Sequence, residues 1–274
     1  MARVVLVTGS TDGIGRQTAR MLAAGGLKVI LHGRNKPKVD AVVAELREEL
    51  PGAELDGVSF DLGSLASVQR GAEQVLAKAP ELHVLLNNAG IFASERTVTG
   101  DGIELTLAVN HIGPFVLTEL LMPRLLASAG AVASRVIDVA SVAHTRGRIH
   151  LDDLQLGSAW TGYAAYAQSK LANVMHASSL AERHDPAKLV AYSLHPGVIG
   201  TKLLRQGFGP IQGASLEVGA RTSVRLAAEE TVVAPSGSYF SDGVVAQPSS
   251  AARDDKVREG LWEASMRLGR LAAS

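Results

Sequence analysis

The sequence of 274 residues contains no cysteine and has no excess of charge of either sign. The absence of cysteine excludes disulfides, thiolate metal sites and a cysteine nucleophile. Lysine plus arginine and aspartate plus glutamate each number 27, so the formal net charge is zero. A balanced charge is not the electrostatic pattern of a protein that binds nucleic acid or anionic membranes.

Long apolar runs are also missing from this sequence. No run approaches the roughly 20 consecutive apolar residues that a membrane-spanning helix needs. The first apolar run begins at Val4, which leaves no room for a signal peptide. We therefore expect a cytoplasmic protein whose partners include neither nucleic acid nor a membrane.

The first sixteen residues have the pattern of a strand, a glycine turn and a helix. Val4 to Val7 form a short apolar run typical of a buried parallel strand. Gly9, Gly13 and Gly15 follow, and a helical segment comes after them. Such a turn can hold a dinucleotide pyrophosphate, because glycine lets the backbone approach it and the helix N-terminus offers free N–H groups. The glycine spacing differs from the common fingerprint, so an ordinary glycine-rich turn is the alternative.

Strand and helix patterns then alternate along the whole chain. Predicted strands cover residues 4–7, 28–33, 58–60, 82–86, 135–139, 189–194 and 238–240. Predicted helices cover residues 16–22, 38–50, 64–76, 103–126, 163–183, 214–228 and 261–271. This alternation predicts an α/β fold, a Rossmann-type doubly wound parallel sheet with helices on both faces. We expect residues 1–274 to form a single domain, with ligands at the carboxyl ends of the strands.

Several polar residues follow predicted strands. An NAD-selective site usually has an acidic residue at the end of the second strand, but this chain has Gly33 there, followed by Arg34. Arg34 could pair with the 2′-phosphate of NADP, or it could be an ordinary surface arginine. Asp61 follows the third strand and could either contact adenine or begin a turn. Residues 87–90, Asn-Asn-Ala-Gly, follow the fourth strand and could bind backbone and cofactor together or form an unremarkable loop.

A proline lies inside the long predicted helix over residues 103–126. Proline has no N–H, so Pro114 leaves the carbonyl of Asn110 without its usual helical partner. A freed carbonyl inside a helix marks a kink, often with bound water. The alternative is a structural kink without a chemical role.

Three further polar residues form a recognisable set. Ser141 ends the fifth predicted strand, while Tyr166 and Lys170 are four residues apart and therefore share one face of a helix. A tyrosine and a lysine at that spacing also occur by chance on solvated helix faces. Their occurrence with Ser141, Asn110 and the glycine turn favours a functional site.

Taken in order, these motifs resemble those of the short-chain dehydrogenases/reductases, over nearly the whole chain. The resemblance also includes residues 195–197, His-Pro-Gly, and it implies that Asn110, Ser141, Tyr166 and Lys170 form a catalytic tetrad. Residues 141–144, 152–154, 169–173 and 261–265 resemble the retinol dehydrogenase and WW-domain-oxidoreductase branch. We assign no residue to a metal, and we assign cofactor binding to Gly9, Thr11, Asp12, Gly13, Ile14, Gly15, Arg34, Asn35, Asp61, Leu62, Asn88, Ala89, Gly90, Tyr166, Lys170, Pro196, Gly197, Val198 and Thr201.

The sequence therefore predicts an oxidoreductase that moves a hydride between NADP(H), rather than NAD(H), and a secondary alcohol or carbonyl compound. The substrate is expected to be apolar, with walls from residues 142–162 and from a substrate loop at about 201–218, where Trp160, Leu203, Leu204, Phe208 and Ile211 lie. The alternative is an NADP-binding sensor without turnover on the same fold. The resemblance also suggests a homodimer or homotetramer, although a longer segment over residues 142–162 could block such pairing.

Overall fold

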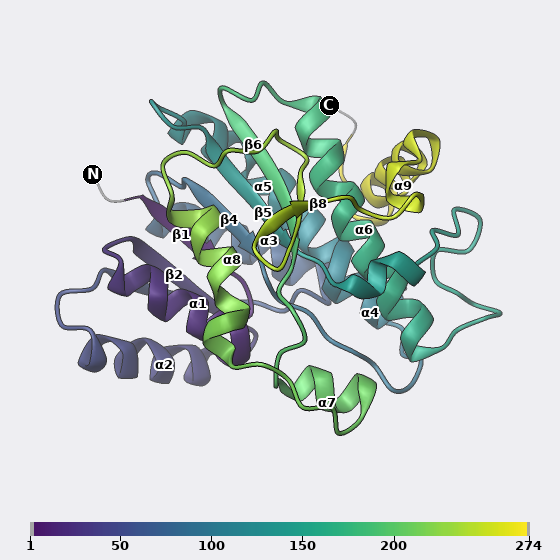
Figure 1. Ribbon diagram of the computed structural model, residues 1–274, viewed down its shortest axis with the longest axis horizontal. Helices are drawn as coiled ribbons and strands as arrows, with labels where there is room; N and C mark the ends of the chain where they lie inside the picture. The colour runs from purple at the N-terminus through teal and green to yellow at the C-terminus, as the bar shows by residue number, and fades with distance from the viewer. Residues whose placement is uncertain (1–2, 273–274) are drawn as a thin grey trace.

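Residues 3–272, which the computed structural model describes, form one eight-stranded sheet with helices on both faces (Figure 1). The strand order is β3-β2-β1-β4-β5-β6-β7-β8, and only the β7–β8 pair is antiparallel. The order reverses between β1 and β4, which is where open α/β sheets bind ligands. The strands are β1 (Val4–Val7), β2 (Lys28–Gly33), β3 (Leu55–Ser59), β4 (Val84–Asn87), β5 (Ser134–Val139), β6 (Leu189–His195), β7 (Tyr239–Ser241) and β8 (Val244–Ala246).

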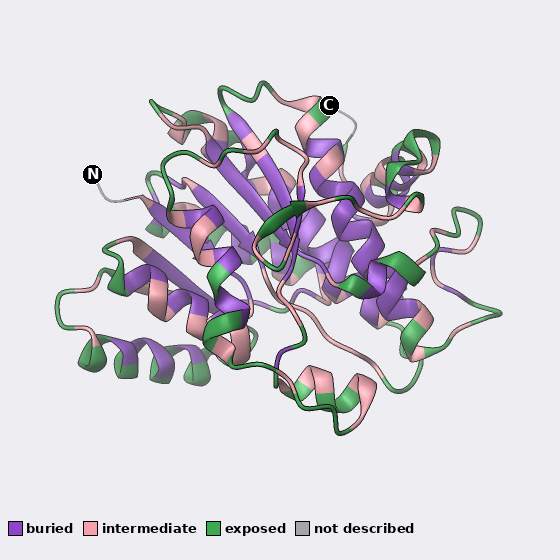
Figure 2. Ribbon diagram, in the orientation of Figure 1, coloured by how far each residue is buried: buried purple, intermediate pink, exposed green. Residues whose placement is uncertain are grey.

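The helices lie in two layers, one on each face of the sheet. Apolar residues of α1, α2 and α8 pack on one face, and those of α3, α5, α6 and α9 pack on the other. Figure 2 shows the sheet buried between these layers. The α-helices are α1 (Gly13–Ala24), α2 (Lys36–Glu49), α3 (Leu65–Lys78), α4 (Leu105–Leu107), α5 (Gly113–Ser128), α6 (Gly162–Arg183), α7 (Lys202–Phe208), α8 (Leu216–Ala228) and α9 (Asp255–Leu268).

The central strands are buried on both faces because their side chains alternate between the two layers. In β1, Val4 and Leu6 join the core under α3 and α5, whereas Val5 and Val7 join the core under α1 and α2. This is why the strand appears in the sequence as a continuous apolar run, as parallel strands covered on both sides do. The predicted α/β class and parallel sheet are confirmed.

Some element boundaries differ from those predicted. The helix expected over residues 103–126 is divided into α4, a π-helical turn η1 (Ala108–Ile112) and α5, so the irregularity precedes Pro114 rather than coinciding with it. The last helix begins at Asp255 because Asp254 caps it. The short elements that were not predicted include α7 inside the substrate loop and the edge strand β8.

The expectation that no segment is long and apolar enough to cross a membrane was too strict. Within residues 3–272, the continuous helical stretch Leu105–Ser128 meets that test by length and composition. Of its most apolar part, 78% is buried inside the protein. The packing of α5 against α3 and β5 accounts for this apolar composition.

Candidate active site

The glycine turn after β1 is fixed by a buried histidine of the neighbouring strand. The Gly9 amide donates to Nδ1 of His32 (3.1 Å), and Nε2 of His32 faces the Phe60 carbonyl at 3.0 Å. The ring must therefore be neutral with its proton on Nε2. Burial lowers the pKa of His32 to about 4, which keeps the ring in this form at neutral pH.

The glycines of the turn allow close contact with the loop that follows β4. Gly9 has φ +64°, and a Cβ there would lie only 2.8 Å from Cα of Ala89. A Cβ at Gly15 would clash with the amide of Asn88, which donates to the Thr8 carbonyl at 2.7 Å. The two loops that the sequence assigned to cofactor binding are therefore brought together by direct backbone contact.

The start of α1 has the properties of an anion-binding site. Asp12 caps the helix by accepting from the Gly13 amide (2.8 Å), and its other oxygen pairs with Lys202 at 2.6 Å. The hydrogen bond from Lys202 is the main reason why the pKa of Asp12 lies below its usual value. The amides of Ile14 and Gly15 have no acceptor within residues 3–272. Gly13 has φ +56°, a conformation that favours glycine, and a Cβ there would meet only Cγ2 of Thr201, at 3.9 Å, so a phosphate group could approach these amides.

The residues after β2 lie beside this turn. A Cβ at Gly33 would come within 2.6 Å of Cγ2 of Thr11, so the tight packing leaves no room for the acidic side chain of an NAD-selective site. Arg34 is exposed and forms no hydrogen bond or ion pair with residues 3–272. Asn35 caps α2 through the amide of Lys38 (2.9 Å). The guanidinium of Arg34 is therefore free to bind an added phosphate.

After β3, Asp61 adopts the turn that the sequence left as one of two alternatives. Its Oδ1 accepts from the Gly63 amide at 2.8 Å, and its backbone N–H donates to Oγ of Ser67 at 2.9 Å. The side chain of Leu62 is 5% exposed and belongs to the core. Any contact of Leu62 with a cofactor would therefore involve its backbone.

Helix α6 presents Tyr166 and Lys170 to the end of β5. Both side chains are buried, and Nζ of Lys170 donates to the Val139 carbonyl at 2.8 Å. The same Nζ lies 5.7 Å from the centre of the Tyr166 ring. Ser141, two residues after the end of β5, is near enough to the phenol for its hydroxyl to lower the pKa of Tyr166. Thus the structure brings the three residues of the predicted set together.

Burial shifts the ionisation of both groups on α6. It raises the pKa of Tyr166 to about 12, and the hydrogen bond with Ser141 opposes this only in part. Burial lowers the pKa of Lys170 to about 8, although the negative charge of Asp138 opposes that change. At pH 7 the free protein therefore has a neutral phenol next to a charged ammonium.

Asn110 lies in the π-helical turn and connects this turn to α6. Its amide group exchanges hydrogen bonds with the backbone of Ile91 and donates to Oγ of Ser169 at 3.0 Å. The side-chain amide of Asn173, oriented with its nitrogen towards Asn110, donates to the Asn110 backbone carbonyl at 2.8 Å. The carbonyl that the sequence predicted to be free of its helical partner is thus bound by a side chain of α6.

The segment after β6 lies over the glycine turn. Gly197 turns the chain with φ +94°, and Ile199 pairs with Ala214, so the intervening residues form a loop with a closed base. Thr201 caps α7 through the Leu204 amide (3.1 Å), and its Cγ2 lies 3.9 Å from where a Cβ of Gly13 would be. The remaining predicted residues of this segment, Pro196 and Val198, are partly or fully exposed beside it.

An aromatic cluster closes the space above Tyr166. Phe92 and Phe208 lie 5.6 and 5.9 Å from the Tyr166 ring, and Leu203 packs on the same cluster. Trp160, predicted as a pocket wall, instead donates to the carboxylate of Glu104 at 3.1 Å. Two other predicted wall residues, Leu204 and Ile211, are not part of this cluster, and Ile211 is 49% exposed.

Four residues that contribute to this site were missed from the sequence: His32, Phe92, Asn173 and Lys202. Asn173 was detectable, because it lies three residues after Lys170 on the same helix face. The others are brought in by contacts distant in sequence, for which the chain carries no local signal. Within residues 3–272, no group of three or more histidine or acidic side chains lies in a metal-binding arrangement.

Comparison with known proteins agrees with this geometry. The family model described as short chain dehydrogenase matches residues 3–208. The chain is 38% identical to human retinol dehydrogenase 12, with 97% of this chain and 86% of that protein covered. It is 39% identical to mouse polyprenol dehydrogenase, with 97% and 83% covered. An uncharacterised protein of Mycobacterium paratuberculosis has a similar solved structure, with a TM-score of 0.81, 32% identity, and 98% and 94% of the two chains covered. This chain therefore belongs to the short-chain dehydrogenase family and is an oxidoreductase.

Proposed function

We propose that this protein transfers a hydride between NADP(H) and an apolar secondary alcohol or ketone, with Tyr166 as the acid/base. The observation that carries this proposal is the convergence of Tyr166, Lys170 and Ser141 at the end of β5. A ketone and an alcohol differ by a hydride and a proton, and the bound nicotinamide supplies or accepts the hydride. The protein's own task is to move the proton and to stabilise the carbonyl oxygen.

Three side chains have distinct tasks in this proposal. Tyr166 exchanges the proton with the substrate oxygen, and Ser141 donates a hydrogen bond to the same oxygen. Lys170 lowers the pKa of the phenol by its charge and contacts the cofactor ribose. Asn110 holds the π-helical turn against α6. Its carbonyl, which now accepts from the Asn173 amide, is proposed to bind instead the water that links Lys170 to solvent.

The magnitude of the lysine effect follows from its position. A unit charge at 5.7 Å from the ring centre, with an effective dielectric near 20, contributes about 3 kcal/mol, or about two pKa units. Burial raises the pKa of Tyr166 to about 12 in the free protein, with the opposing effect of Ser141 already counted. The charge of Lys170 and, once the cofactor is bound, the positive charge of oxidised nicotinamide are proposed to favour ionisation of the phenol.

The turn after β1 fits a dinucleotide. The two free amides at the start of α1 and the uncrowded backbone at Gly13, with Thr201 nearby, are suited to a pyrophosphate. Selectivity for NADP is proposed to come from Arg34, whose planar fork can bind the 2′-phosphate. Gly33 supports this choice, because a side chain there would clash with Thr11.

An apolar substrate fits the cluster of Phe92, Tyr163, Leu203 and Phe208 around the phenol. Two relatives carry the names of apolar alcohols, retinol and polyprenol. The burial of most of the apolar stretch Leu105–Ser128 supports a role for it as a core helix, and a cytoplasmic location stays a proposal. A homodimer or homotetramer stays a prediction.

The proposal is tested by a panel of ketones and alcohols of increasing apolar length, assayed with NADP(H) and with NAD(H) by nicotinamide absorbance. We expect turnover that increases with apolar length and a higher kcat/KM with NADP(H). Tight NADP(H) binding without turnover on any member of the panel would instead favour the sensor alternative.

A further inference from the structure

A buried acidic side chain lies directly behind the proposed acid/base pair. Asp138 is part of β5 and is only 2% exposed. Its Oδ1 accepts from the Asn87 amide at 2.9 Å, and its Oδ2 lies 2.8 Å from Nδ1 of His176 on α6. A carboxylate in the core is costly unless it is paired and hydrogen-bonded, so its retention in a central strand requires a reason.

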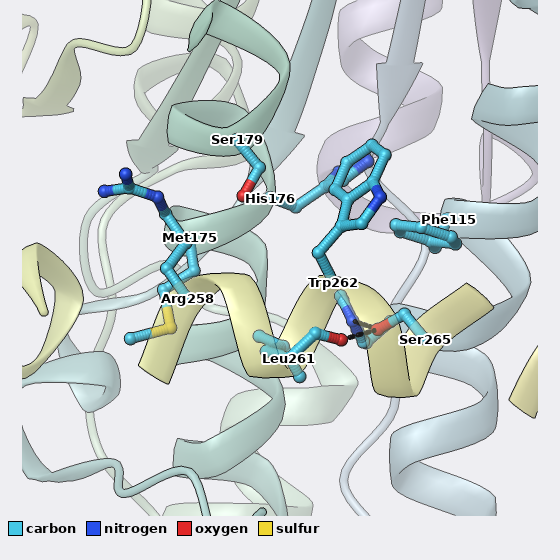
Figure 3. A pocket seen from close by; sticks show the side chains of 9 residues that line it. Phe115, Met175, His176, Ser179, Arg258, Leu261, Trp262 and Ser265 are labelled. Atoms are coloured by element: carbon cyan, nitrogen blue, oxygen red, sulfur yellow. Dashed lines mark hydrogen bonds between the residues drawn. The ribbon is translucent and has the colours of Figure 1, made fainter. Parts of the chain in front are cut away.

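The second partner, His176, lines a small cavity between α6 and α9 (Figure 3). Its ring packs against those of Phe115 and Trp262, and its Nε2 has no hydrogen-bond partner within residues 3–272. Ser179, three residues further along α6, lines the same cavity. The cavity has a volume of about 10 Å³, which is the space of about one water molecule.

Other ionisable groups surround His176 without replacing Asp138 as its partner. His111 in the π-helical turn is bonded to Ser265 of α9, and burial lowers the pKa of His111 to about 3, so it is neutral. Burial raises the pKa of Glu119 on α5, an effect that His176 and Arg183 oppose, and Arg258 of α9 lines the cavity. Asp138 is therefore the acceptor that orients His176.

The pair lies close to Lys170 through the backbone of β5. The Val139 carbonyl that accepts from Nζ of Lys170 belongs to the residue after Asp138. On α6, His176 lies six residues after Lys170, and Asn173 lies between them, so the helix contacts β5 at successive points. The hydrogen bond between His176 and Asp138 thus fixes the position of α6 on the strand from which Lys170 is held.

We propose that Asp138, held by Asn87 and His176, is the fixed counter-charge that keeps the buried Lys170 ammonium protonated, and that His176 is a positioning residue. The inference rests on the proposed function, in which Lys170 acts as a cation. Neither Asp138 nor His176 is proposed to touch substrate or cofactor; both act through Lys170.

The physical reason is that Lys170 has lost its hydration. Burial lowers the pKa of Lys170 to about 8, and the charge of Asp138 is what opposes a further decrease. Without that charge, Lys170 would lose its proton close to neutral pH. The phenol of Tyr166 would then lose the cation that favours its ionisation.

The test measures the protonation of Lys170 directly in the free enzyme. Protein labelled with ¹³C at the lysine ε-carbons is titrated by NMR, and the Lys170 signal is assigned with Lys170→Arg. The variants are Asp138→Asn, which removes the charge at nearly constant size, and His176→Phe, which keeps a ring packed against Phe115 and Trp262 but removes the donor. Ser179→Ala is the matched control, because it alters the same cavity without touching Asp138.

We expect Lys170 to titrate near 8 in the wild type and at least about one pH unit lower in Asp138→Asn, which is a tenfold loss of proton affinity. His176→Phe should shift it in the same direction, because a carboxylate without this donor is less able to remain ionised. The shift of the Lys170 titration in the double variant should be little larger than the shift in either single variant. In Ser179→Ala, Lys170 should titrate as it does in the wild type.

An unchanged Lys170 titration in folded Asp138→Asn overturns the proposal. If that variant does not fold, as judged by circular dichroism, an unchanged titration in His176→Phe overturns it equally. Neither measurement needs turnover, so a failure of the proposed dehydrogenase activity would be seen separately in the substrate panel. Where substrate is turned over, both variants should lose activity more at alkaline than at acidic pH, whereas a purely structural defect would lower activity at every pH.

Discussion

Replacement of Lys170 by methionine tests whether the lysine charge sets the ionisation of Tyr166. Methionine keeps a long unbranched side chain in the buried site but removes the ammonium that lies 5.7 Å from the phenol ring centre. That charge is worth about 3 kcal/mol at an effective dielectric near 20, or about two pKa units. We expect the rising limb of the oxidation pH profile to move to higher pH by about this amount.

The assay is the pH dependence of kcat for alcohol oxidation, with the cofactor dissociation constant measured separately by fluorescence titration. Lys170→Met should also weaken cofactor binding, because the lysine is proposed to contact the ribose. Lys170→Arg keeps the charge but not its point geometry, so it should restore only part of each property. Tyr166→Phe should lower kcat by roughly 10²–10⁴-fold or more while cofactor binding is retained.

Two results would refute this reasoning. If Lys170→Met loses rate without any change in the kinetic pKa, the lysine only holds the ribose. If Tyr166→Phe retains nearly full turnover, the phenol is not the acid/base, and the assigned mechanism is wrong.

The remaining predictions concern selectivity, the helix irregularity and acid stability. Arg34→Ala should reduce the preference for NADP(H) over NAD(H), measured as the ratio of kcat/KM values; equal ratios in both proteins would exclude Arg34 as the selector. Pro114→Ala supplies an N–H that competes with Asn173 for the Asn110 carbonyl, so activity should fall while Tm holds or rises; unchanged activity would remove Pro114 from the mechanism. Burial lowers the pKa of His32 from 6.5 to about 4, so the neutral ring contributes fully to the free energy of unfolding above pH 6.5. Between pH 6.5 and pH 4 the unfolded chain binds a proton that the folded protein does not, so the free energy of unfolding should fall by up to about 1.4 kcal/mol per pH unit. Denaturant unfolding between pH 4 and 6.5 measures this change. If the free energy of unfolding of a His32→Gln variant changes with pH as steeply as that of the wild type, the prediction is contradicted.

The central part of the fold was predictable because its signals are local. Val4 to Val7 and the other apolar runs identify buried strands, and their alternation with helices limits the topology to a parallel sheet. The rule that ligands bind at strand ends then placed Ser141 and residues 87–90 at one edge before any contact was known. These placements follow from strand direction alone, so they needed no knowledge of side-chain partners.

The edge strand β8 had a local signal that the sequence interpretation did not use. Asp242 and Gly243 both have positive φ, and an Asp-Gly pair between two β-branched or aromatic runs is typical of a two-residue hairpin. Val244 and Val245 are 64% and 52% exposed, so β8 lacks the buried apolar pattern by which the other strands were found. The short helix α7 packs mainly through Leu203 and Phe208, too few apolar positions to establish a helical period.

The side-chain partners inside the sheet layers could be predicted only where they lie on one helix. Tyr166, Lys170 and Asn173 follow the spacing of a single helix face, and His176 continues it by one further turn, so α6 could have been recognised as a polar face directed at the sheet. Asp138, the acceptor of His176, lies 38 residues away in sequence, within an apolar run that indicates a buried strand. A charged residue in the middle of such a run is itself informative, since burial requires a partner. That partner lies on α6, one of the helices that pack on β5, and α6 also carries the tyrosine and lysine proposed as the acid/base pair.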